Sequence, residues 1–161
     1  MNMKRLTLPV IILLSLVVLA SPSHAISAGD MVKFLPDRIL DFTTTSERPA
    51  IEDLQKKGGE YHRVQKKYNS KSGRMAVVAI IRGADVAKGI ASQFSKGTSL
   101  LSMKGFKGVV NPSEQPGLIY SISVRLRDDQ MITVVTLNTK NSNIAKEFLN
   151  ALDLEGLSKL Q

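Results

Sequence analysis

The sequence predicts a single α+β domain in which helices pack on one face of a mainly antiparallel sheet. Segments with strand periodicity come in pairs connected by short turns, one helical segment follows the first pair, and another closes the chain. No internal repeat, low-complexity region or interdomain linker divides it. We expect the domain to comprise residues 26–161, which is long enough to bury a core without covalent staples.

Residues 1–25 have the three zones of a secretory signal peptide. Lys4 and Arg5 precede an almost wholly apolar stretch, 6–20, and a polar end with small residues follows it. The apolar stretch has 15 residues, fewer than the roughly 20 that cross a bilayer, which favours a cleaved leader over a membrane anchor. We expect cleavage between Ala25 and Ile26, a mature chain without a transmembrane segment, and a periplasmic or secreted location.

The chain contains no cysteine, although exported proteins can form disulfides. Core packing must therefore stabilise the fold. The composition also excludes thiol catalysis, disulfide exchange, thiolate metal sites, haem attachment through cysteine and a lipid anchor on cysteine.

The first part of the predicted domain is irregular. Residues 26–33 are expected to be a short leader, and 34–42 a single turn around Pro36 that places apolar side chains against the core. A strand is predicted near 41–46. Residues 50–57 are expected to form a short turn of helix or an irregular loop, because Pro49 and a Gly-Gly pair bracket them.

A hairpin is predicted next. Residues 61–68 mix aromatic, β-branched and basic side chains, which is typical of an edge or half-exposed strand. Residues 69–73 are turn-forming, and 74–82 form an apolar strand near the centre of the sheet. A helix is predicted from an Asp85 cap to Gly97.

The second half repeats this pattern of strands followed by a helix. Residues 99–110 are expected to supply a short strand, and 112–117 a loop. Alternation predicts a strand over 120–127 with one dry and one wet face, and a turn at 128–130 leads to a strand over 131–137.

A C-terminal helix is predicted after a cap at Asn141 or Ser142. Residues 154–160 are expected to add one further turn. The apolar positions of the helix are Ile144, Ala145, Phe148, Leu149 and Leu152.

The order of elements resembles that of small secreted proteins with a PsbP-like αβα sandwich. The segments "FLPDRILDF" and "EFLNALDLEGL" also look like those of short periplasmic proteins. The resemblance implies an accessory or binding protein, and it carries no catalytic residue to this chain.

Few side chains have the pattern of a catalytic or metal site. His62 is the only histidine after the predicted leader, no nucleophile motif accompanies it, and we expect it to be an ordinary strand residue. The methionines of the predicted domain are widely spaced in apolar runs, as in a core. Asp128 and Asp129 are expected to be turn residues rather than a cation site. We therefore expect no enzyme activity, no cofactor and no metal.

Basic residues are concentrated in the middle of the chain. From Lys56 to Lys107 there are 12 basic residues and two acidic ones. Such a field attracts anions if folding gathers the side chains, although basic residues are often only solvated surface. The candidate binding residues, mixed with aromatic side chains, are Arg63, Lys66, Lys67, Tyr68, Lys71 and Arg74.

These observations favour a non-catalytic periplasmic binding or accessory protein that engages an anionic envelope component or a protein partner through a basic surface. A cell-envelope hydrolase and an exported immunity or inhibitor protein are the alternatives. Nucleic acid is not an expected partner, because the leader directs the chain out of the cytoplasm and no recognition motif is present. The oligomeric state stays open.

Overall fold

The computed structural model describes residues 26–45, 48–56, 59–83, 86, 89, 92, 99–111, 119–139, 141 and 143–160. Its elements are, in chain order, α1 (Ala28–Val32), β1 (Arg38–Ile39), β2 (Phe42–Thr44), β3 (Ala50–Lys56), β4 (Gly59–Ser70), β5 (Met75–Gly83), β6 (Ser99–Met103), β7 (Phe106–Asn111), β8 (Ile119–Arg127), β9 (Gln130–Leu137), α3 (Asn143–Ala151) and α4 (Leu154–Ser158).

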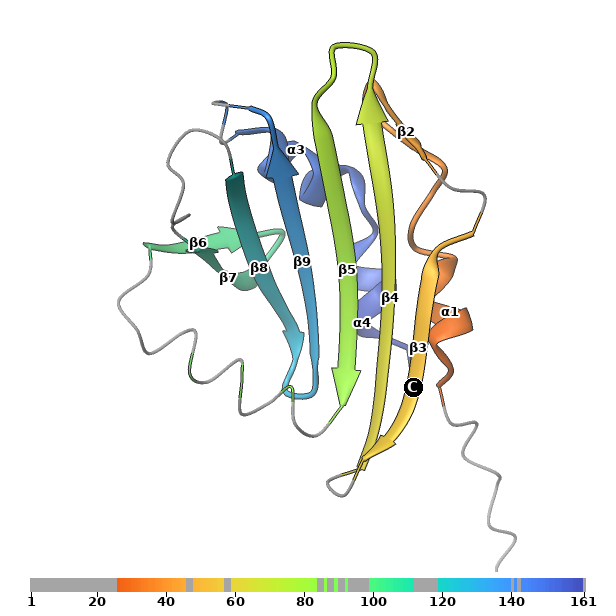
Figure 1. The fold of residues 1–161 in the computed structure, drawn as a ribbon. Coiled ribbons are helices and arrows are strands. Elements are labelled where there is room, and N and C mark those ends of the chain that lie inside the picture. Colours follow the sequence, from red (N-terminus) through yellow and green to blue (C-terminus); the bar gives the residue numbers. More distant parts are fainter. Residues whose placement is uncertain are drawn as a thin grey trace, which may run out of the picture.

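The described strands form one antiparallel sheet with the long β4–β5 hairpin near its middle (Figure 1). The order across the sheet is β1, β2, β4, β5, β9, β8, β7 and β6. β3 pairs with the first half of β4, and β2 pairs with its last three residues, so both lie on the same side of β4. β4 is therefore enclosed by hydrogen-bonded strands on both sides for most of its length.

Two glycines meet the backbone requirements of this hairpin, one in its turn and one at the end of β5. Gly73 in the β4–β5 turn has a φ of 78°, in the left-handed region that favours glycine. Gly83 at the end of β5 has a φ of 150°, and a Cβ there would lie 2.6 Å from the carbonyl oxygen of Glu60. A side chain at Gly83 would therefore push β4 and β5 apart.

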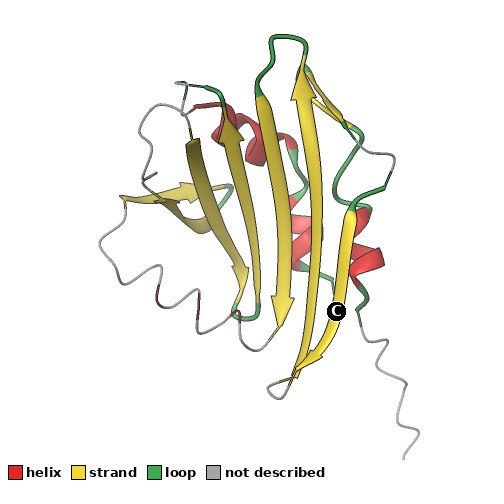
Figure 2. Ribbon diagram, in the orientation of Figure 1, coloured by secondary structure: helices red, strands yellow, loops and turns green. Residues whose placement is uncertain are grey.

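α1, α3 and α4 all pack on one face of the sheet, which we call the covered face; the opposite side is the open face (Figure 2). Phe148 of α3 lies at the centre of the core beneath the covered face. Its ring contacts those of Phe42 and Tyr68 edge to face, with centroids 4.9 and 5.6 Å apart. Helices and sheet thus share one continuous core.

Strand alternation decides which side chains enter that core. Val64, Ile80, Ile132 and Val124 lie opposite one another across β4, β5, β9 and β8, and all four are fully buried on the covered face. Their chain neighbours point to the open face. The row formed by four fully buried branched side chains is the apolar centre of the sheet.

Most of the predicted regular elements are confirmed. The strand pairs β4–β5 and β8–β9 lie where the periodicity placed them, and β2 lies within the predicted 41–46. All five apolar positions predicted for the C-terminal helix are buried, four of them in α3 and Leu152 directly after it. The backbone N–H of Asn143 donates to Oδ1 of Asn141, as one of the two predicted caps requires. The predicted single strand over 99–110 is a hairpin, β6–β7.

Two predictions for the first part of the domain are wrong. Residues 50–56 form strand β3, not a turn of helix or a loop, because seven consecutive residues pair with β4. Residues 28–32 form helix α1 rather than an irregular leader. Ser27 and Asp30 make a capping box at its start, in which Asp30 accepts from the backbone N–H and hydroxyl of Ser27.

Of the two alternatives predicted for 61–68, the edge strand is wrong and the half-exposed strand is confirmed, since buried and more exposed side chains alternate along it. Lysine and arginine in a strand suggest an edge because edges are protected by charge. In this protein β4 is interior, and its basic side chains are accommodated by the two faces of the sheet instead.

Two residues predicted on the wet face of 120–127 are not exposed there. Ser123 is 1 % exposed, because its hydroxyl bonds to Asn111 and Thr133 on the neighbouring strands. Arg127 follows an irregularity in the β8–β9 register and reaches the covered face, where it meets Leu160.

Some predictions lie outside the described residues. They are the signal peptide over 1–25, the loop over 112–117, the alternative cap Ser142 and most of the helix over 85–97. Val86, Gly89 and Ser92 are described and helical. Val86 is buried against Met131, with Tyr61 and Ile81 beside it, on the open face.

Truncation of buried side chains should cost more stability on the covered face than on the open face. Phe148→Ala should lower the free energy of unfolding by about 3–5 kcal/mol, because it opens a cavity between α3 and the sheet. Val124→Ala should cost about 2 kcal/mol through two lost methyl groups and their cavity. Val135→Ala on the half-buried open face is the matched control and should cost less. Denaturant unfolding measures all three, and equal losses for Val124 and Val135 would contradict the assignment of faces.

Candidate functional site

The predicted binding residues lie on two opposite faces and in one turn. Side chains alternate along β4, so Arg63 and Lys67 point to the open face, whereas Lys66 and Tyr68 point to the covered face. Lys71 lies exposed in the β4–β5 turn. The six residues of the basic segment therefore do not form one surface.

Lys66 and Tyr68 are interior residues that attach β4 to the turn before β1. Lys66 is 4 % exposed, and its ammonium donates to the carbonyl oxygen of Leu35 at 2.7 Å and to Asp37 at 2.6 Å. The fully buried Tyr68 hydroxyl donates to the carbonyl oxygen of Pro36 at 2.9 Å. Both residues are thus buried, with partners inside the fold, and we leave them out of the binding surface proposed below.

Arg74 also has partners within the fold. Its guanidinium donates to Asp41 at 2.6 Å and to the hydroxyl of Ser72 at 2.8 Å, and it lies 5.2 Å above the centre of the Phe42 ring. These contacts tie the β4–β5 turn to the segment before β2. Lys71, three residues earlier, makes no such contact within the described chain.

The open face gathers basic residues from both sides of the sheet. Arg63 and Lys67 lie on β4, and Lys107 and Arg125 lie on β7 and β8. The Arg63 guanidinium bonds to Gln65 and lies 3.8 Å from the carboxylate of Glu52. Lys107 and Arg125 were not among the predicted site residues, although the alternation of 120–127 already places Arg125 on the wet face.

An apolar strip lies at the Lys67 end of the open face, two rows away from Arg63 and Arg125. Met75, Leu137 and Ile119 are neighbours across β5, β9 and β8, and Val77 faces Val135 in the next row. All five side chains are half-buried and belong to neither cluster of buried apolar residues. Lys67 is the β4 neighbour of Val77, so a cation borders the strip directly.

A row of polar side chains crosses the covered face at the other end of the sheet. Each residue is the register partner of the next, from β3 through β4, β5 and β9 to β8. We call this set the polar row: Asp53, His62, Arg82, Gln130 and Arg127. The sequence could not predict it, since the segment of Asp53 was expected to be irregular and only strand register aligns the others.

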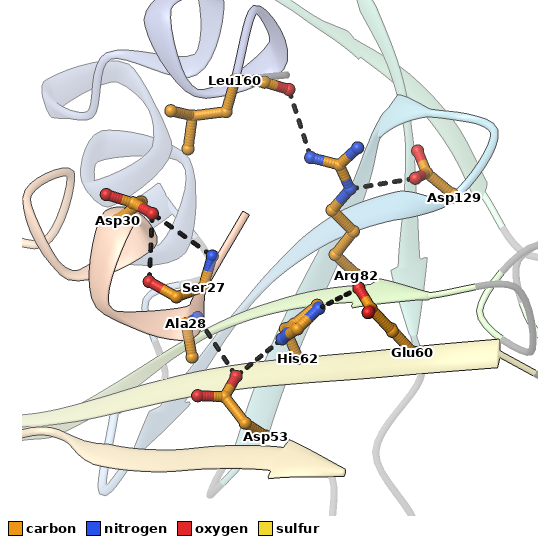
Figure 3. Close-up of polar contacts among 9 residues, drawn as sticks. All are labelled: Ser27, Ala28, Asp30, Asp53, Glu60, His62, Arg82, Asp129 and Leu160. Atoms are coloured by element: carbon orange, nitrogen blue, oxygen red, sulfur yellow. Dashed lines mark hydrogen bonds and ion pairs between the residues drawn. The ribbon is translucent and has the colours of Figure 1, made fainter. Parts of the chain in front are cut away.

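His62 is held by carboxylates on both sides of its ring (Figure 3). Its Nδ1 lies 2.6 Å from Oδ1 of Asp53 and its Nε2 lies 3.4 Å from Oε2 of Glu60. The same Asp53 oxygen accepts the backbone N–H of Ala28 at 3.1 Å. This contact joins the start of α1 to β3 and β4.

Two arginines of the polar row meet at the same carbonyl. Nη1 of Arg82 and Nη1 of Arg127 donate to the carbonyl oxygen of Leu160 at 3.2 and 2.9 Å. Asp129 in the β8–β9 turn accepts from Nε of Arg82 at 3.0 Å (Figure 3). The same carboxylate lies 3.5 Å from Nε of Arg127. Gln130 lies between the two arginines in the register and is fully buried.

A pocket of about 380 Å³ lies between the β6–β7 turn and α4, apart from every predicted site residue. Lys104, Asp153 and Glu155 line it with charges of both signs. The Lys104 ammonium already donates to the carbonyl oxygen of Leu152 at 2.8 Å, which fixes the turn against the end of α3.

No protein-family model, curated protein or solved structure matches this chain. In the described residues, no group of three or more histidine or acidic side chains is placed to hold a metal ion. None of the described helices is long and apolar enough to cross a membrane. The chemistry of the site therefore has to be argued from its own residues.

Buried Tyr68 should make the protein less stable at alkaline pH. Burial, and to a smaller extent the charge of Asp37, raises the pKa of the Tyr68 phenol. A raised pKa in the folded state contributes stability that is present below the unfolded pKa of about 10 and is lost as the pH rises above it.

Denaturant unfolding between pH 8 and 11.5 tests this expectation. Wild-type protein should lose more stability over that interval than Tyr68→Phe, which has no phenol to ionise at this position. The variant should start about 1 kcal/mol lower at pH 8, because the hydrogen bond to Pro36 is lost. Parallel curves for the two proteins would show that Tyr68 ionises as freely as an exposed tyrosine.

Proposed function

We propose that this protein is a non-catalytic binding protein of the periplasm or extracellular space, and that it engages an anionic envelope component or an acidic protein through the open face of its sheet. The residues that bind are the exposed cations Lys67 and Lys107, with Lys71 at the β4–β5 turn and Arg63 and Arg125 beside them.

The observation that carries this proposal is the lack of internal partners for the exposed lysines. Among the described residues, no acidic side chain pairs with Lys67, Lys71 or Lys107, whereas Arg63 lies near Glu52 and Arg125 bonds to Asp128. Positive charge without an internal counterion raises the local concentration of anions and the rate at which they are encountered.

The proposed location follows from the leader predicted over residues 1–25. Ile26 is 8 % exposed, and Ala28 and Met31 are fully buried beneath the covered face. Cleavage between Ala25 and Ile26 would leave these three side chains in the mature chain.

We also propose that the fold is an αβα sandwich of the PsbP-like kind. Three helices pack on the covered face, and the helical residue Val86 packs against Met131 on the open face. Helical packing on both faces of the sheet is what such a sandwich requires.

The contacts of His62 support a binding role over hydrolysis. A histidine that acts as general base needs a ring nitrogen free to accept the proton of a nucleophile. In the described chain each nitrogen of His62 has a carboxylate partner, and the nearby Ser27 hydroxyl bonds to Asp30 instead.

Reversal of two open-face charges tests the proposal. The mature domain is immobilised and exposed to a solubilised envelope fraction, and the captured phosphorus and protein are measured. Lys67→Glu with Lys107→Glu should abolish capture, because exposed charges attract the ligand. Added salt should weaken wild-type capture, because such charges are screened beyond about 8 Å at physiological ionic strength.

The matched control is Lys33→Glu with Lys159→Glu, which changes the net charge equally at the two exposed residues that follow α1 and α4. It should capture as wild type does. Lys66 is excluded from the test, because a carboxylate there would lie beside Asp37 in the interior. Equal capture by the two double variants would mean that the open-face lysines are only solvated surface.

A further inference from the structure

The best-defined unexplained feature of the structure is the amide of Gln130. Its side chain is fully buried, and neither Nε2 nor Oε1 has a hydrogen-bond partner among the described residues. Buried polar groups in folded proteins are nearly always paired, because desolvation without a compensating bond is costly. A ligand that supplies an acceptor and a donor together would satisfy both atoms of this amide.

The surroundings of Gln130 define the charge of that ligand. Arg82 and Arg127 lie on the strands to either side of Gln130, and both guanidiniums reach inward to one oxygen, the carbonyl of Leu160. That oxygen consequently lies above the β9 strand that carries Gln130. The two cations share a single carboxylate, Asp129, so one positive charge is left without a counterion in the described part of the cluster.

We propose that Arg82, Arg127 and Gln130 form a site for an oxyanion that carries a hydroxyl group, and that the Leu160 carbonyl occupies it in the ligand-free protein. Hydrogen phosphate, a phosphomonoester or a 2-hydroxycarboxylate has this chemistry. The anionic oxygens accept from the two guanidiniums and from Nε2 of Gln130, and the ligand hydroxyl donates to Oε1.

Entry of the ligand requires only that the end of the described chain moves. Leu160 follows α4, whose buried Leu154 and Leu157 keep that helix on the core. The carbonyl of Leu160 makes neutral hydrogen bonds to the arginines, and an anionic oxygen makes stronger ones to the same donors. The Leu160 segment thus competes with the ligand and closes the site when no ligand is bound.

Four small anions test the proposal on the full mature chain by calorimetry and thermal unfolding at constant ionic strength. Phosphate and glycolate carry a hydroxyl, whereas sulfate and acetate are their closest counterparts without one. Phosphate, glycolate or both should bind and raise the melting temperature, and sulfate and acetate should not; which of the two binds identifies the source. The proposal is overturned if phosphate binds no more tightly than sulfate and glycolate binds no more tightly than acetate.

Two variants locate the site. Gln130→Leu keeps the volume and removes the unpaired amide, so the ligand-free protein should be as stable as wild type or more so, while affinity for the anion falls about tenfold or more. Leu160→Ala loosens the competing segment and should strengthen binding. Unchanged affinity in Gln130→Leu, or weaker binding in Leu160→Ala, would contradict the assignment.

This site lies on the covered face, so it is independent of the proposed open-face function. Lys67→Glu with Lys107→Glu should leave binding of the small anions unchanged. Loss of small-anion binding in that double variant would place the anion on the open face and overturn the site at Gln130.

Discussion

The enclosure of β4 is the constraint on which the rest of the structure depends. Because strands bond to it on both sides, each of its side chains must point either into the core or to the open face. That choice divides a run of basic residues that is continuous in sequence. Lys66 becomes an interior cation that holds the turn before β1, and its neighbours Arg63 and Lys67 become part of a surface.

The regular parts of the fold could be predicted from the sequence because their signals are local. Alternation identifies β8, an unbroken apolar run identifies β5, and helical spacing identifies the buried side of α3. β3 could not be predicted in this way, because it forms a strand through its pairing with β4 and not through its own composition. The basic residues of β4 likewise suggested an edge strand, because composition alone does not show which strands pair on either side. The topology places β4 inside the sheet.

The two candidate sites were less predictable than the fold, because strand pairing brings their residues together from distant parts of the sequence. Lys107 of β7 and Arg125 of β8 share a face with Lys67 of β4 only because β5 and β9 are assembled between β4 and β8. The polar row depends even more on assembly, since five strands each contribute one residue to it. His62 was correctly placed on a strand, but its partner Asp53 lay in a segment expected to be irregular. The two faces thus carry separate polar systems.

The central claim is that adjacent residues of β4 have opposite roles, and denaturant unfolding of Lys66→Ala and Lys67→Ala tests it most directly. Lys66→Ala should lower the free energy of unfolding by about 1–3 kcal/mol, because the carbonyl of Leu35 loses its buried donor. Lys67→Ala should change it by no more than about 0.5 kcal/mol, as is usual for an exposed side chain. Equal effects of the two substitutions would contradict the account.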